Sequence, residues 1–228
     1  MNDLAQKLIE ELQCETVFTI PVLGGIPVSE AVVVTWIIMA VLVVIAFILT
    51  RNLKVDHISK RQAVAESIVT GLMNMVQGMV GEKGKEYVPY LTTVMLYIGV
   101  SNIIGLFGFK SPTKDLRVTV ALALMSIILI EAAGIYHKGV KRWLHGFVEP
   151  VAIVTPINIL EVVTKPLSLC MRLFGNVLGA FVIMELLKMI LPVGLPVVFS
   201  LYFDIFDGLL QAYVFVFLTS LYIDEITE

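Results

Sequence analysis

The sequence predicts an all-α membrane protein with about five transmembrane helices and one interfacial helix, the last two transmembrane helices forming a long, strongly tilted hairpin. Of its 228 residues, 58% are hydrophobic and only 15% are charged, whereas about 25% of a soluble domain is charged. The mean hydropathy is +0.92. The hydrophobic residues are gathered in long runs, and a helix needs about 20 apolar residues to cross a bilayer. Because no internal repeat or low-complexity linker is visible, we expect residues 1–228 to form a single membrane domain.

The charge and the cysteine content argue against several other classes of protein. The net charge is −3 and no basic stripe alternates with aromatic residues, so we expect no nucleic-acid partner. Two cysteines are too few for a disulfide framework or a four-thiolate site, and the three histidines lack metal-ligand spacing. We therefore expect neither a metal site nor a cofactor site.

The N-terminal segment 1–28 is expected to lie outside the membrane, ahead of the first span. The first 30 residues contain five acidic residues and only one basic residue, Lys7. A secretory signal begins instead with a basic region followed by an apolar one. We therefore expect the first span, Ala31–Thr50, to be retained, with an acidic tail in front of it.

Residues 57–81 are expected to form a helix on the cytoplasmic side, lying at the membrane interface. Apolar residues alternate there with charged and polar ones, which is typical of an interfacial helix. A buried cytoplasmic hairpin is the alternative interpretation of this segment.

Two further spans are followed by an apolar segment that is too long for one span. Tyr87–Phe109 carries no charge, and Val118–Tyr136 carries one, Glu131, which we expect near a polar cavity or a loop lysine. The apolar sequence then runs over residues 150–223, with a break at 191–196, where two prolines flank a glycine. This break predicts a turn between two helices.

The distribution of Lys and Arg predicts an external N-terminus and a cytoplasmic C-terminus. Nine basic residues fall on one side of the spans and four on the other, and the richer side faces the cytoplasm. The absence of a targeting presequence fits a multi-pass protein of a bacterial plasma membrane. The nine are Arg51, Lys54, Lys60, Arg61, Lys83, Lys85, Lys138, Lys141 and Arg142, and the four are Lys7, Lys110, Lys114 and Arg117.

The segment 150–191 is too long to stand upright in a bilayer as one helix. As a helix it would measure about 63 Å, at about 1.5 Å per residue, whereas the hydrocarbon core is about 30 Å thick. We therefore predict a helix that is strongly tilted, bent at Pro156 and Pro166, or both. Two short spans with a re-entrant turn near Pro166 are the alternative.

Ionisable residues, which are costly inside a membrane and usually functional, are concentrated in the last third of the chain. In the first of the two final helices, polar residues recur at spacings of three and four, which places them on one face. This polar stripe consists of Glu161, Lys165, Ser168, Arg172, Asn176 and Gly179. The final helix has a stripe of its own, formed by Asp204, Asp207, Gln211, Phe215, Leu218 and Tyr222.

Folding the two final helices about Gly194 pairs residues whose numbers sum to about 388, twice 194. Glu185 then lies beside Asp204, and Arg172 lies opposite Val216. Two polar clusters result: Glu185, Asp204 and Asp207 near the outer turn, and Arg172, Asn176 and Gln211 deeper in the hairpin. Carboxylates near the outer surface are able to take up protons from water, whereas an arginine stays protonated.

A long motif lies at the centre of the polar stripe. Residues 166–176 read Pro-Leu-Ser-Leu-Cys-Met-Arg-Leu-Phe-Gly-Asn. They resemble the signature Pro-x-Ser-Leu-x-x-Arg-Leu-Phe-Gly-Asn of subunit a of the F-type rotary ATP synthases, the stator subunit beside the ring of c subunits. Shorter likenesses extend the resemblance over about residues 30–223. They are Asn102-Ile-Ile-Gly-Leu, Ser111-Pro-Thr-Lys-Asp115 with Thr119-Val-Ala-Leu-Ala-Leu, Gly139, Pro150, Pro156-Ile-Asn-Ile-Leu-Glu161, and Gln211-Ala-Tyr-Val-Phe with Leu218-Thr-Ser-Leu-Tyr222.

The resemblance implies a function and a set of partners. The chain would carry protons, or Na⁺, through two offset half-channels to and from the carboxylates of the c-subunit ring, coupling ion flow to ring rotation and ATP synthesis. It would be no enzyme by itself, but the ion-translocating subunit of the complex. The implied partners are the c-subunit ring, the b subunits of the peripheral stalk, the remaining ATP synthase subunits and membrane lipids.

The resemblance also implies roles for individual residues. Arg172 matches the essential arginine, a charge barrier facing the ring carboxylate, and we expect Gln211 and Asn176 to hold its guanidinium by hydrogen bonds. The family often has Glu or His nine residues after this arginine, where this chain has Phe181. The outer relay is therefore expected at Asp204. Asn102, Glu185 and Asp207 complete the outer half-channel, and Glu161, Lys165, Ser168 and Tyr222 line the inner one.

Simpler roles stay open for several of these residues. Glu185 and Lys188 have the spacing of a surface ion pair, and Asp207 has the alternative role of hydrating the outer channel. The loop that contains Lys114, Asp115 and Arg117 is expected to be solvated. A stand-alone ion-coupled secondary transporter is the alternative function, although such transporters often consist of two repeated halves. The chain has no Gly-x-x-x-x-Gly-Lys-Ser/Thr nucleotide loop.

Overall fold

The computed structural model describes residues 16–20, 26–51, 53, 59–107, 109, 111–148, 152–190 and 194–227. Within these residues, five helical stretches are long and apolar enough to cross a membrane, which confirms the predicted helical membrane fold. They are Glu30–Thr50, Glu82–Phe107, Leu116–Lys138, Thr155–Leu187 and Val198–Thr227.

A short β-hairpin precedes the first span, and the sequence analysis did not predict it. Strands β1 (Thr16–Ile20) and β2 (Ile26–Ser29) pair in antiparallel fashion. They are the described part of the expected external segment, most of which lies outside the described residues. Helix α2 (Glu30–Thr50) follows at once, and its side chains from Val41 to Thr50 are almost all exposed, as expected of a helix that faces lipid.

Helix α3 (Lys60–Gln77) occupies the segment predicted to be interfacial. Residues 57 and 58 of the predicted helix lie outside the described part of the chain. The Ser59 hydroxyl caps α3 by accepting a hydrogen bond from the Gln62 amide. Because α3 is one continuous helix with exposed apolar side chains such as Val64 and Ile68, the buried hairpin alternative is wrong. Its position at the membrane interface stays a prediction.

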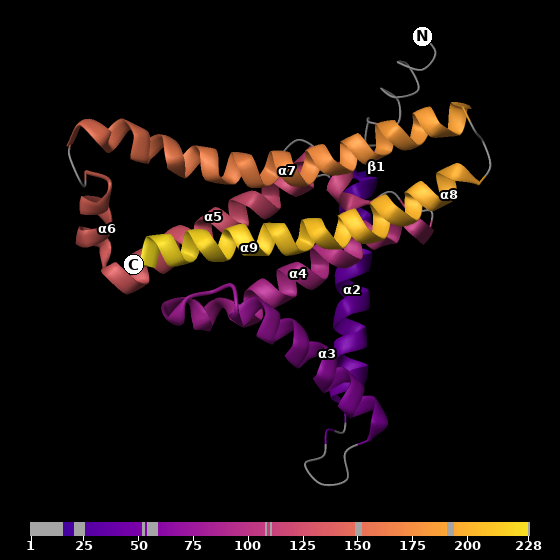
Figure 1. Ribbon diagram of the computed structural model, residues 1–228, viewed down its shortest axis with the longest axis horizontal. Coiled ribbons are helices and arrows are strands. Elements are labelled where there is room, and N and C mark those ends of the chain that lie inside the picture. The colour runs from indigo at the N-terminus through magenta and orange to yellow at the C-terminus, as the bar shows by residue number, and fades with distance from the viewer. Residues whose placement is uncertain are drawn as a thin grey trace.

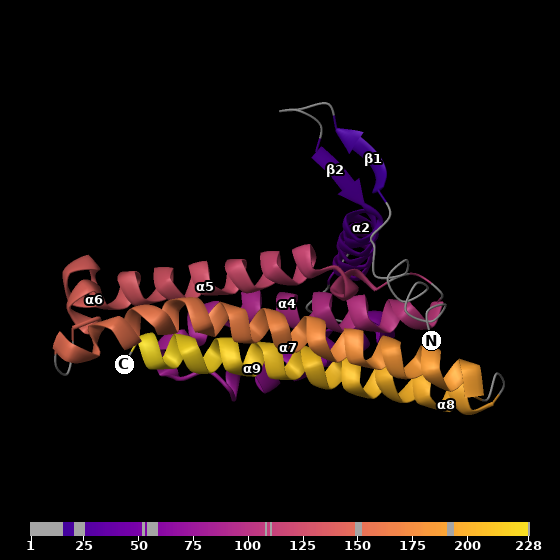
Figure 2. The same cartoon turned by 90° about the horizontal axis from the view of Figure 1, so that it is seen from above.

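The centre of the molecule consists of α4 (Val88–Ile103), α5 (Leu116–Lys138), α7 (Thr155–Ile190) and α9 (Gly208–Thr227). Helix α9 packs against α4 and α5, and α7 packs mainly against α5. Figure 2 shows the four helices running together, whereas α2 runs across them in Figure 1. The shared core contains Leu91, Ile98, Ile130, Leu173, Phe215, Val216 and Ile223.

Short elements join these helices. Turn η1 (Glu82–Tyr87) leads into α4, and η2 (Ile104–Phe107) continues it. Turn η3 (Pro112–Lys114) precedes α5, while α6 (Val140–Gly146) and η4 (Ala152–Val154) connect α5 to α7. Helix α8 (Leu195–Ser200) and the π-helix η5 (Leu201–Asp207) lead into α9.

The predicted hairpin of two long helices is present, and α7 is continuous. It contains Pro166 in its interior, so the alternative of two short spans with a re-entrant turn is wrong. Pro156 lies in the first turn, where no backbone N–H is required. Figures 1 and 2 show α7 and α9 side by side, joined through Gly194, whose φ of 91° favours glycine. At 36 residues α7 is about 54 Å long, so tilt in a bilayer stays the prediction.

Candidate functional site

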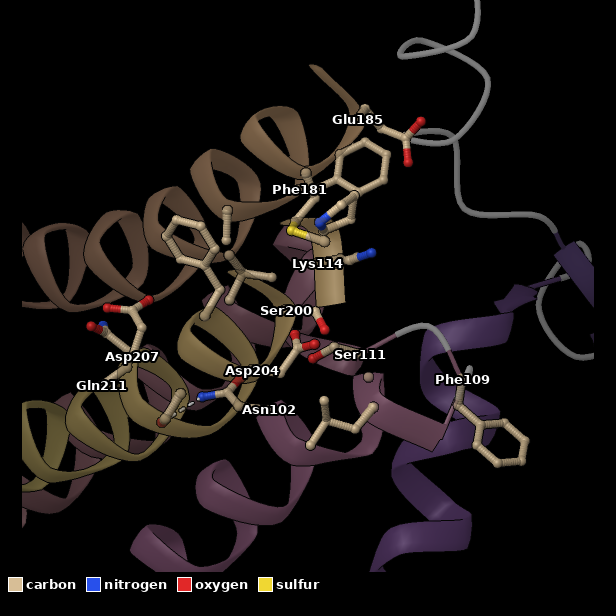
Figure 3. A pocket seen from close by; sticks show the side chains of 18 residues that line it. Asn102, Phe109, Ser111, Lys114, Phe181, Glu185, Ser200, Asp204, Asp207 and Gln211 are labelled. Atoms are coloured by element: carbon tan, nitrogen blue, oxygen red, sulfur yellow. Dashed lines mark hydrogen bonds between the residues drawn. The ribbon is translucent and has the colours of Figure 1, made fainter. Parts of the chain in front are cut away.

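A cavity of about 450 Å³ lies at the turn end of the hairpin, between α7, α8, η5 and the end of α4 (Figure 3). The predicted outer residues Asp204, Asp207, Glu185 and Asn102 all line it, together with Gln211. The structure therefore brings together the outer cluster that the hairpin register predicts. The side chain of Lys188, the alternative partner of Glu185, lies outside the described residues.

The two aspartates of this cavity are carried by the π-helix η5. π-helical segments are rare in proteins, and those that occur frequently lie at functional sites. Asp204 packs against the backbone of η2, because a Cβ added at Gly105 would lie only 3.3 Å from its Oδ1 atom. Regular α-helical structure resumes at Gly208, so the irregular segment lies only where it lines the cavity.

Asn102 builds the wall of this cavity through a buried hydrogen-bond network. Its Nδ2 donates to the Gly208 carbonyl at 3.0 Å, and its Oδ1 accepts from the Thr113 hydroxyl at 2.8 Å. The neighbouring Ser111 hydroxyl donates to the Ser101 carbonyl at 2.7 Å. Asn102 thus connects α4, η3 and α9, and both polar groups of its side chain are engaged in holding them together.

The loop between α4 and α5 is less solvated than expected. Asp115 is buried, accepts from the Ser29 hydroxyl at 2.9 Å and caps α5 by accepting from the Arg117 amide at 2.9 Å. Lys114 is half-buried and its Nζ lies 4.4 Å from the centroid of the Phe181 ring. The prediction of a solvated loop is wrong for these two residues and right for the exposed Arg117.

Two direct contacts between α7 and α9 agree with the predicted hairpin register. Asn176 Nδ2 donates to Gln211 Oε1 at 2.7 Å, and the numbers of these residues sum to 387. Lys165 Nζ lies 5.1 Å from the Tyr222 ring centroid, again at a sum of 387. Gln211 is almost fully buried, and its Nε2 has no partner among the described residues.

Arg172 lies on the exposed face of α7, between these two contacts. Ser168 is also exposed, whereas Leu169, Cys170 and Leu173 on the other face are buried. The expected hydrogen bonds from the guanidinium to Asn176 and Gln211 are absent among the described residues, where Asn176 donates to Gln211 instead. The charge of Arg172 therefore lies on the exposed face of α7, away from the hairpin core.

A second polar group lies at the other end of the hairpin and contains two of the predicted inner residues, Glu161 and Lys165. Lys165 Nζ lies 3.0 Å from Glu225 Oε2 and 3.8 Å from Glu161 Oε2. These three residues line a cavity of about 230 Å³. Glu131, which accepts from Trp143 Nε1 at 2.9 Å, lies in a polar cavity as expected. Sequence reasoning missed Glu225, because it lies beyond the apolar run. Two of the predicted inner residues, Ser168 and Tyr222, do not line the cavity.

Comparison with known proteins gives a consistent result. Residues 32–224 match the family described as the ATP synthase A chain. The chain is 35% identical over 203 residues to an ATP synthase subunit a of Moorella thermoacetica, covering 88% of this chain and 92% of that one. It is 34% identical over 215 residues to a sodium-ion-specific ATP synthase subunit a of Propionigenium modestum, covering 87% of this chain and 74% of the relative. An ATP synthase subunit a of Chlorobaculum parvum is 33% identical over 208 residues, covering 90% and 91%.

Proposed function

The chain belongs to the ATP synthase A chain family, whose members are the ion-translocating subunit a of F-type ATP synthases, and we propose that Arg172 separates two half-channels within it. It is thus a membrane subunit that works with the other subunits of the complex. The relatives named above are all ATP synthase subunits, which gives the stand-alone transporter alternative no support. The chain is proposed to be no enzyme by itself, because ATP chemistry would reside in other subunits.

One observation carries the proposal: the hairpin has a polar cavity at each end and Arg172 between them. The outer cavity is lined by α7 residues from Val177 onward, and the inner one by α7 residues up to Lys165. Arg172 lines neither cavity. An ion would therefore have to leave this chain to pass from one cavity to the other, and the c-ring carboxylate would carry it.

The chemistry of the side chains supports this division of roles. An ion taken up from outside would bind at Asp204, with Glu185 and Asp207 in the same cavity, and pass to the ring carboxylate beside Gln211. After rotation the ion would leave past Ser168 toward Glu161, Lys165 and Tyr222. Arginine keeps its proton, so Arg172 would attract the ionised ring carboxylate and block a direct leak between the half-channels.

The exposed side chains of α7 support the proposed contact with the c ring, and the distribution of basic residues supports the proposed orientation. The exposed guanidinium and Ser168 make this face of α7 the proposed contact with the c ring. The end of the hairpin near Lys138, Lys141 and Arg142 would face the cytoplasm of a bacterial cell, since loops rich in Lys and Arg stay inside. The N-terminus would then be external and the C-terminus cytoplasmic, and the b subunits and lipids would cover other faces.

Disulfide crosslinking in the assembled complex tests the proposed face. A cysteine at the exposed Ser168 should crosslink to a cysteine near the membrane carboxylate of the c subunit, in a background where Cys170 is replaced by Ser. A cysteine at Leu169, which is 1% exposed, is the matched control and should react poorly. Equal crosslinking at both positions, or none at Ser168, would contradict the proposed contact.

A further inference from the structure

The outer cavity contains a cation that the mechanism above does not use. Lys114, the last residue of η3, lines the cavity and holds its ammonium over the Phe181 ring at 4.4 Å, a favourable cation–π contact. In Figure 3 its side chain lies between those of Phe181 and Asp204. A flexible lysine in a solvated loop would instead extend into water.

The backbone on both sides of Lys114 is fixed by buried hydrogen bonds. Thr113 is fully buried and donates to Asn102 Oδ1 at 2.8 Å, and Asp115 accepts from Ser29 at 2.9 Å. These bonds tie η3 to α4 and to the start of α2. The direction in which Lys114 leaves the backbone is therefore set by the fold, and it leads into the cavity.

Lys114 is the one cationic side chain among the described residues that line this cavity, and three carboxylates share the space with it. Asp204 and Asp207 come from η5 and Glu185 from α7, while α4 and η2 contribute the uncharged Asn102 and Gly105. Of the two aspartates, Asp204 lies on the side of Lys114 in Figure 3. Asp207 lies on the side of Gln211 in Figure 3.

We infer that Lys114 is the counter-charge of Asp204 in the outer half-channel, with Phe181 serving as the platform that holds its ammonium. This inference rests on the proposed role of Asp204 as the outer ion-binding group. An adjacent ammonium favours the ionised carboxylate over the carboxylate that holds a proton or Na⁺. Lys114 thus acts as a positioning residue that weakens ion binding at Asp204, so that the ion is released toward the ring.

The test is ATP synthesis by proteoliposomes that contain the whole ATP synthase with its catalytic part outside. The initial rate is measured against internal pH at a fixed external pH and a fixed potassium diffusion potential, and then against internal Na⁺ at fixed pH. Whichever ion drives synthesis, Lys114→Met should shift the midpoint of the titration with that ion to a lower ion concentration. The expected shift is about one pH unit for H⁺ or about tenfold for Na⁺. Lys114→Arg should keep the wild-type midpoint, because it keeps the charge.

Three further variants make the outcome decisive. Arg117→Met removes the same charge from an exposed position in the same loop and should leave the midpoint unchanged. Phe181→Leu removes the aromatic platform, should shift the midpoint in the same direction by a smaller amount, and keeps the test usable if Lys114→Met fails to assemble. Asp204→Asn should be nearly inactive.

The two ideas fail in different ways. An unshifted midpoint in Lys114→Met and Phe181→Leu, or an equal shift in Arg117→Met, overturns the role of Lys114 while leaving an inactive Asp204→Asn explained. Normal synthesis by Asp204→Asn overturns the proposed outer route itself.

Discussion

Replacing Gly208 with alanine tests the packing that holds the outer cavity together. A Cβ at Gly208 would lie 2.8 Å from the Cβ of Asn102, an atom that moves only with the backbone of α4. Overpacking of this kind costs about 1–3 kcal/mol, and loss of the Asn102 hydrogen bond to the Gly208 carbonyl costs about 0.5–1.5 kcal/mol more. Alanine regains about 1 kcal/mol of helix propensity. The net expectation is a destabilisation of about 2 kcal/mol, or roughly 30-fold in an opening equilibrium.

Cys170 supplies the readout for this prediction. Its thiol is buried at 4% exposure and lies 3.5 Å from the Thr119 hydroxyl, so a maleimide reaches it only when the helices separate. With Cys14 replaced by Ser, Gly208→Ala should raise the labelling rate by roughly 30-fold and lower ATP-driven ion pumping.

The matched control lies in the same interface between α4 and α9. A Cβ at Gly99 would make an ordinary contact of 3.6 Å with Leu209, so Gly99→Ala should slow labelling through better helix propensity. Wild-type labelling and pumping in Gly208→Ala would refute the packing argument, as would a larger defect in Gly99→Ala.

Two further predictions concern the hairpin itself. Asp204→Asn should lower ATP-driven pumping while the complex still assembles, because the variant has no ionisable group at the proposed outer site; unchanged pumping in vesicles would remove Asp204 from the route. Asn176→Leu should leave the Gln211 side chain, 2% exposed, without a partner and destabilise the hairpin by about 1–3 kcal/mol. The rate of Cys170 labelling measures this loss of stability. Asn176→Gln retains the amide and is expected to lose less stability than Asn176→Leu.

The helical part of the site was predictable because helix periodicity and a turn signal act locally. The spacing of three and four placed Lys165, Arg172 and Asn176 on one face, and the Gly194 turn predicted a register with which the Asn176–Gln211 hydrogen bond agrees. The exposed Arg172 and the buried Leu173 agree with that periodicity.

Other features depend on contacts between distant segments, which no local pattern reveals. Lys114 enters the cavity because Thr113 and Asp115 are bonded to residues far away in the sequence. The π-helix over Leu201–Asp207 changes the helical register within a continuous apolar run, so periodicity gives no sign of it. Among the described residues Arg172 makes no bond to Asn176 or Gln211, and Asn176 donates to Gln211 instead, a choice between partners that spacing does not decide.

We propose that Arg172 acts through a permanent charge between the half-channels. A charge near the bilayer centre costs at least about 2.5–3.5 kcal/mol on insertion scales, and no described residue hydrogen-bonds or pairs with this guanidinium. A transient partner, the ionised ring carboxylate, is therefore proposed. Arg172→Lys should fail as well, since a compact ammonium does not reproduce the planar guanidinium.

The most direct measurement is passive ion flux in vesicles that contain the complete ATP synthase with Arg172→Ala, with ATP synthesis and ATP-driven pumping assayed in parallel. Arg117→Ala, which removes an exposed arginine outside the hairpin, serves as the control. We expect an assembled complex without coupled synthesis or pumping and with an increased passive leak, because the ring carboxylate then carries ions between the half-channels unopposed. Normal ATP synthesis by Arg172→Ala, or a tight membrane without coupling, would contradict it.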